Sequence, residues 1–211
     1  MNSKKRVNEL FSDADPKVFG RRIFMAKSVG FAAGLSILAF PGIATKALEA
    51  QGNKSKEEIL KELEAKVDKF MPVYGTCSQT SFAVLNEQFG LKADRAIAGL
   101  MPFAGGIVGR GETCGAVSGS ILAIGFFIDQ KGKDPYAASM KLGGLFFNGF
   151  EKEFGSTRCK EVVKHQFGRY YDFLNPEDQK LFMAESLKTG KCLEVVKKAV
   201  LIAGGIFLDN Y

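Results

Sequence analysis

Apolar residues recur at helical spacing near the start of the charged, folded part of the chain. In residues 55–72 they stand three or four positions apart, with charged residues between them: Ile59, Leu63, Val67 and Phe70. This spacing predicts an amphipathic helix. Ser55 and Glu58 form the pattern of a capping box, which marks a helix start. Pro72 and Gly75 are expected to end the helix.

The same periodicity continues to the end of the chain. Gly90, Gly155, Gly168 and Gly190 are stop signals between apolar runs, and Asn175 is a capping residue. The further helices predicted are 77–89, 93–100, 114–130, 134–154 (capped by Asp134, with Pro135 first), 156–167, 175–189 and 192–208. No pair of alternating strands joined by a hairpin turn is visible. We therefore predict an all-α fold, a compact bundle of about six to eight helices with a glycine-rich loop.

The N-terminal segment has a different pattern. A basic start ends in Arg21 and Arg22, and an uncharged apolar run follows over residues 28–44. This layout resembles a twin-arginine export signal, although Gly20 replaces the usual Ser or Thr and the lysine comes one place late, at Lys27. We therefore expect residues 1–47 to be a signal and processing region, cleaved after Ala44 or Ala47, and the protein to be periplasmic. The alternative is a membrane anchor, for which this run is short.

The rest of the chain divides into two parts by composition. Residues 48–72 form a linker and the amphipathic helix, and residues 73–211 form a helical domain that contains all four cysteines. The net charge of +6 comes mostly from residues 1–50, which carry eight Lys and Arg against four Asp and Glu. The remainder is nearly balanced and has no basic stripe interleaved with aromatic residues. Nucleic acid is therefore not an expected partner.

The stretch "GRGETCGAVSG", residues 109–119, is dense in glycine. A phosphate-binding loop needs lysine where this chain has Glu112, and a dinucleotide-binding loop needs glycine where it has Cys114. Phosphate binding is thus excluded, and close packing or access to a cofactor remains. The positions with little side-chain bulk are Gly111, Gly115, Ala116 and Gly119. The same bare face would also suit a contact between two copies of the chain, a homodimer.

The four cysteines, Cys77, Cys114, Cys159 and Cys192, contain no CxxC pair. Each lies at or near a predicted helix start, and four helix starts can converge at one end of a bundle. A helix start also favours the thiolate form. Four such thiols suit an iron–sulfur cluster, a structural zinc ion or a reactive dithiol system. Two structural disulfides are an equal alternative in an exported protein.

The cysteine pattern resembles that of the redox-active C_GCAxxG_C_C family: one cysteine, then "CGAVSG", then two separated cysteines. The stretch "GKCLEVVKKA" strengthens this match, which covers residues 73–208. That family is similar to the split-Soret cytochromes, exported proteins that combine haem with an iron–sulfur centre. The resemblance implies that the four cysteines are cluster ligands or redox thiols. The chain has no CxxCH, and its single histidine is His165. Covalent c-type haem is therefore excluded, and we interpret His165 as a partly exposed helix residue.

The favoured hypothesis is an exported electron-transfer protein with an iron–sulfur cluster of undetermined type on the four cysteines. Its partner would be another redox protein, either free or bound to a membrane. Export of already folded protein suits a cofactor that is inserted in the cytoplasm. The alternatives are a thiol–disulfide redox protein and a non-enzymatic helical module with structural disulfides or zinc.

Overall fold

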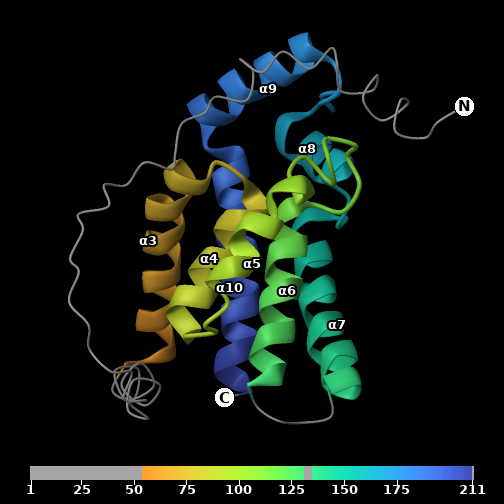
Figure 1. The fold of residues 1–211 in the computed structure, drawn as a ribbon. Helices are drawn as coiled ribbons and strands as arrows, with labels where there is room; N and C mark the ends of the chain where they lie inside the picture. Colours follow the sequence, from red (N-terminus) through yellow and green to blue (C-terminus); the bar gives the residue numbers. More distant parts are fainter. Residues whose placement is uncertain (1–53, 131–134, 211) are drawn as a thin grey trace, which may run out of the picture. The chain divides into compact units, whose positions relative to one another are not determined.

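The computed structural model describes residues 54–130 and 135–210 (Figure 1). The chain divides into two units, Met1–Ala39 and Phe40–Tyr211, and all the described residues belong to the second. The expected export signal with Arg21 and Arg22, and the expected helix cap Asp134, lie outside the described residues.

The described residues are almost entirely helical, as expected for an all-α fold. They form eight α-helices and one 3₁₀ turn: α3 (Lys56–Tyr74), α4 (Cys77–Phe89), α5 (Asp94–Gly99), η1 (Met101–Phe103), α6 (Gly115–Asp129), α7 (Pro135–Phe154), α8 (Cys159–Phe167), α9 (Pro176–Thr189) and α10 (Lys191–Asp209). No strand occurs in this part of the chain, where the only extended pairing is a single antiparallel bridge between Thr113 and Arg158.

The predicted caps are formed as the local sequence requires. At the start of α3, the Glu58 backbone N–H donates to Ser55 Oγ over 3.2 Å, and the Ser55 N–H donates to Glu58 Oε2 over 2.7 Å. The expectation that Pro72 ends this helix is wrong, because α3 continues to Tyr74. Gly75, at φ +70°, closes the last turn by donating its N–H to the Met71 carbonyl over 2.9 Å. Proline lacks only one backbone donor and has a helical φ, so this turn accommodates it.

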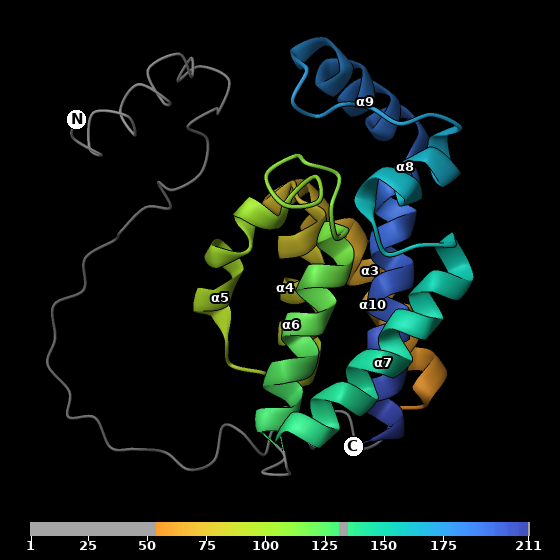
Figure 2. The same ribbon diagram turned by 90° about the vertical axis from the view of Figure 1, so that its right-hand side faces the viewer.

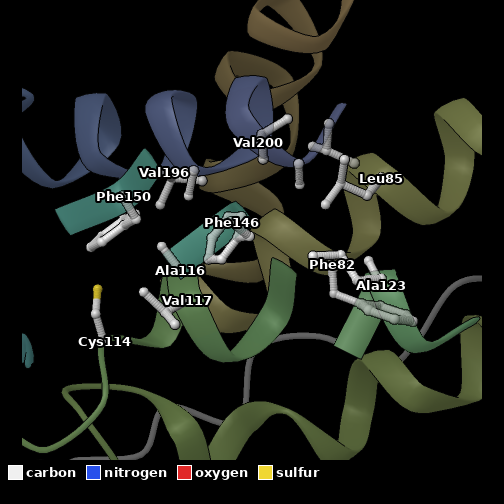
Figure 3. Packing of buried hydrophobic residues seen from close by; sticks show 14 of the residues in the cluster. Phe82, Leu85, Cys114, Ala116, Val117, Ala123, Phe146, Phe150, Val196 and Val200 are labelled. Carbon is white, nitrogen blue, oxygen red and sulfur yellow. The ribbon is translucent and has the colours of Figure 1, made fainter. Parts of the chain in front are cut away.

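Helices α4, α6 and α10 form the centre of the bundle, with α3 on one side and α7 on the other (Figures 1 and 2). The core between them is rich in phenylalanine. Phe127 of α6 and Phe207 of α10 stack with their ring centroids 4.2 Å apart. Phe146 and Phe150 of α7 are fully buried in the same cluster as Val196 of α10 (Figure 3). Each such side chain stabilises the fold by about 1.5–3 kcal/mol through burial.

The central helices α4 and α6 approach very closely because of a glycine. A Cβ atom added to Gly119 would lie 2.2 Å from both Ser78 O and Ser81 Oγ, a distance that no side chain can occupy. The absence of a side chain at residue 119 therefore allows the short distance between the two helices.

Helix α9, like the short helix α5, contains no buried residue. It crosses the end of the bundle at which α4, α6 and α10 begin (Figure 1). In residues 54–130 and 135–210, no helix combines the length and the apolar character that crossing a bilayer requires.

Candidate cysteine site

The four cysteines come from four helix starts. Cys77 is the first residue of α4, Cys114 the N-cap of α6, Cys159 the first residue of α8 and Cys192 the second residue of α10. Helices α4, α6 and α10 all begin at one end of the bundle, and α8 lies at that end too (Figures 1 and 2). Cys114 and Cys159 are buried, whereas Cys77 and Cys192 are half-buried. All four are free thiols.

The thiols meet in two pairs. Cys114 and Cys159 are hydrogen-bond partners, and so are Cys77 and Cys192. The two pairs are also close to each other. Charges on Cys114 and Cys159 raise the pKa of Cys77, and a charge on Cys192 raises the pKa of Cys159. The fold therefore gathers cysteines that are far apart in the sequence into one site.

The thiols of this site differ in acidity. The Cys159 S–H donates to the Cys114 sulfur and lowers the pKa of Cys114, and the backbone N–H groups of Ala116 and Val117 lower it further against the opposing effect of burial. The hydrogen bond to Cys114, together with burial, raises the pKa of Cys159. The hydrogen bond to Cys192 and burial raise the pKa of Cys77 well above its usual value. Of these three thiols, Cys114 ionises first.

Backbone pairing brings Cys114 and Cys159 together. Residues 111–114 and 157–160 run antiparallel, and we call these two segments the cysteine clasp. Three backbone hydrogen bonds join them: the Cys114 N–H to the Thr157 carbonyl (2.8 Å), the Cys159 N–H to the Glu112 carbonyl (2.5 Å) and the Lys160 N–H to the Gly111 carbonyl (3.1 Å). The backbone N–H of each of these two cysteines thus anchors it to the opposite segment, whatever its side chain does.

The glycine-rich loop before the clasp forms a left-handed turn. All five residues from Gly105 to Gly109 have positive φ, including Ile107 at +61° and Val108 at +46°. Such a backbone is strained for β-branched residues and unstrained for glycine. Gly106 also lies very close to Cys159, since a Cβ atom on this glycine would be 2.6 Å from Cys159 Cβ. The dense glycines thus let the loop fold back onto Cys159.

The small residues singled out from the sequence all lie around the cysteines or between the helices that carry them. A Cβ atom on Gly115 would lie 3.1 Å from Ser78 N and 3.4 Å from Cys77 Cβ, and one on Gly111 would lie 3.0 Å from Lys160 Cβ. Ala116 is fully buried. These contacts, like those of Gly119, are with protein atoms, and a role in admitting a cofactor stays a prediction.

Two groups near the site were not expected from the sequence. Tyr170 lies beside Gly111, and burial raises the pKa of its hydroxyl, with smaller contributions from Asp172 and Cys159. Glu112 forms an ion pair with Arg158. Both contacts join residues that are distant in the chain, so no local pattern could indicate them. His165, by contrast, lies on α8 as an exposed residue beside Gln166.

The arrangement of the thiols limits what the site can bind. Within the residues that the structure describes, no group of three or more His, Cys, Asp or Glu side chains is arranged to hold a metal ion. The site offers two thiol pairs, whose chemistry differs from that of a site for one metal ion. Each pair is a dithiol that can form a disulfide by thiol–disulfide exchange.

The fold and the cysteines together define a class, an all-α protein with a four-thiol site. Comparison with protein families gives the particular group: the model described as "Putative redox-active protein (C_GCAxxG_C_C)" matches residues 75–206, a range that includes all four cysteines. The chain belongs to this C_GCAxxG_C_C family, and its role is a redox one. Searches of curated proteins and of solved structures gave no match.

Proposed function

We propose that this protein is an exported electron carrier that holds an iron–sulfur cluster on Cys77, Cys114, Cys159 and Cys192. The observation that carries the proposal is the meeting of four free thiols from four helices in two adjacent pairs. Thiolates are the usual ligands of iron–sulfur clusters, and four of them satisfy the ligand requirement of one cluster.

The pairing favours a two-iron cluster. Cys114 and Cys159 would bind one iron, and Cys77 and Cys192 the other. Such a cluster supplies reversible one-electron chemistry. The chain itself supplies the backbone N–H groups of Ala116 and Val117, which favour the charged form of Cys114 and would thereby help to set the reduction potential.

The N-terminal sequence supports the exported location. A twin-arginine signal carries proteins that are already folded, so a cluster could be inserted before the chain leaves the cytoplasm. The partner would be a second redox protein, soluble or attached to a membrane. A homodimer is compatible with this function and is not required by it.

The test is the metal content of protein purified without oxygen. We expect a brown protein with about two iron and two sulfide ions per chain. Each single Cys→Ser replacement should lower the iron content and alter the visible spectrum, while the exposed His165→Ala control should change neither. A colourless protein that takes up no iron after reconstitution with iron and sulfide would overturn the proposal.

A second function is favoured by one specific observation, the acidic Cys114 hydrogen-bonded to Cys159. In this alternative, the Cys114 thiolate attacks a disulfide of a substrate protein, and a mixed disulfide forms as one substrate thiolate leaves. Cys159 then loses its proton and attacks Cys114, which leaves a Cys114–Cys159 disulfide and a fully reduced substrate. The substrate gains two electrons, and the pair loses two.

The two functions give different results with the same variant. Cys159→Ser in a thiol–disulfide protein should trap the mixed disulfide on Cys114, which mass spectrometry detects as a covalent adduct with a disulfide-containing peptide. A cluster-binding protein should show no such adduct while its iron is bound.

A further inference from the structure

Glu112 and Arg158 stand on opposite sides of the cysteine clasp. The Arg158 Nη2 atom lies 3.2 Å from both carboxylate oxygens of Glu112. Arg158 immediately precedes Cys159, and Glu112 is two residues before Cys114. The ion pair therefore joins the two short segments that carry one of the two thiol pairs.

Glu112 makes two contacts across the cysteine clasp, one through its backbone and one through its side chain. Its backbone carbonyl accepts from the Cys159 N–H, and its carboxylate accepts from the Arg158 guanidinium. Arg158 in turn pairs with Thr113 in the antiparallel bridge. The side-chain ion pair thus spans the same gap as the backbone hydrogen bonds and limits how far the two segments can separate.

Among the described residues, the segments that carry the other thiol pair, Cys77 and Cys192, are not joined by an equivalent ion pair. Apart from the thiol–thiol hydrogen bond, no hydrogen bond or ion pair joins residues 75–79 to residues 190–194 in the described part of the chain. The packing of α4 and α10 against each other and against α3 brings Cys77 and Cys192 together. The two pairs therefore differ in how firmly their sulfur atoms are held.

We propose that Glu112 and Arg158 are a positioning pair that keeps Cys114 opposite Cys159. This proposal rests on the proposed function only in taking the four cysteines as one redox site. An exposed ion pair contributes little to global stability, and both of these side chains are about half exposed. Its effect is therefore local, on the distance between the two sulfur atoms that the clasp controls.

The experiment measures how readily each pair closes to a disulfide. The full-length chain, freed of metal with a chelator, is equilibrated with reduced and oxidised dithiothreitol without oxygen. For each disulfide formed, two thiols lose two protons and two electrons, and the oxidised reagent takes them up to become the dithiol. After quenching with acid and alkylation, mass spectrometry quantifies the Cys114–Cys159 and Cys77–Cys192 disulfides separately.

We expect Glu112→Gln and Arg158→Gln each to lower the equilibrium constant for the Cys114–Cys159 disulfide by about two- to fivefold, and to leave that of Cys77–Cys192 unchanged. The double exchange E112R/R158E should restore the first constant. High salt should reduce the difference between wild type and variants. Lys56→Gln breaks the exposed Lys56–Asp209 ion pair between α3 and α10 and should change neither disulfide.

Several outcomes would overturn the proposal. Equal shifts in both disulfides would indicate a general loss of stability, and no shift in either would show that the ion pair does not position the thiols. A different pairing of the cysteines in the wild-type protein would refute the pairing itself. These outcomes are independent of the cluster, because a chain that binds no iron fails the metal assay and still gives both equilibrium constants.

Discussion

Gly106 lies directly against Cys159: a Cβ atom on the glycine would stand 2.6 Å from the Cβ atom of the cysteine and 2.7 Å from Glu112 N. The residue also has φ +70°. One position in the loop thus serves both the left-handed turn and the close approach to the thiol site.

Gly106→Ala should therefore be strongly destabilising. The positive φ alone costs a residue with a Cβ atom about 1–2 kcal/mol, and the contacts with Glu112 and Cys159 add to this cost. Gly168→Ala is a matched control, because Gly168 has φ +77° and no atom within 4 Å of its Cβ position. Urea unfolding of both variants should show the larger loss for Gly106→Ala. Equal losses would mean that the contact with Cys159 has no energetic importance.

The contact between α4 and α6 predicts opposite effects at two glycines of the same helix. Gly119→Ala should destabilise the fold by about 1–3 kcal/mol, because the methyl group overlaps Ser78 and Ser81. Gly125→Ala should stabilise it by up to about 1 kcal/mol, because residue 125 is helical and nothing lies within 4 Å of the added atom. Thermal or urea unfolding measures both, and a stabilising Gly119→Ala would contradict the close packing of these helices.

The acidity of Cys114 predicts a pH dependence in the reduced, metal-free protein. Its folded pKa lies below the unfolded value of about 8.5. This group therefore adds stability as the pH rises from its folded pKa to about 8.5, and that contribution is lost as the pH falls through the folded pKa. Cys77 and Cys159 act in the opposite sense, since their raised pKa values give stability below about 8.5 that is lost at higher pH.

The ultraviolet absorbance of thiolates follows these ionisations directly. A thiolate that appears below the ordinary cysteine pKa should vanish in Cys114→Ser and should shift to higher pH in Cys159→Ala, because the Cys159 S–H is the largest cause of the lowered pKa. Cys77→Ser should retain it. An ionisation below the ordinary cysteine pKa that survives the loss of Cys114 would show that Cys114 is not the group with the lowered pKa.

Removal of iron should leave the bundle folded, if the protein carries the proposed cluster. The buried core extends along α4, α6, α7 and α10 through residues such as Phe82, Phe127 and Phe207, and among the described residues it includes only two of the cysteines, Cys114 and Cys159. Far-ultraviolet circular dichroism should therefore change little after chelation, while the melting temperature falls because a bound group stabilises the folded state. A chain that unfolds without iron would show that the cluster is part of the core.

The helices were predictable because their signals are local. Asn175 accepts from the backbone amides of Glu177 and Asp178, and Gly90 and Gly190 close their helices in the left-handed conformation. Each signal lies within a few residues of the helix end that it marks. The error at Pro72 arose because a proline near a helix end can stay inside the last turn when a glycine follows.

The sequence alone determined the helical class, the cysteine inventory and the exclusion of phosphate binding at Glu112, since these depend on residue type and short-range spacing. Only the tertiary structure decided that Cys114 pairs with Cys159 and Cys77 with Cys192, and that Glu112 faces Arg158. The two residues of each pair are tens of residues apart in the chain. Their proximity depends on how closely the helices pack and how the glycine-rich loop folds back, and both are properties of the assembled core.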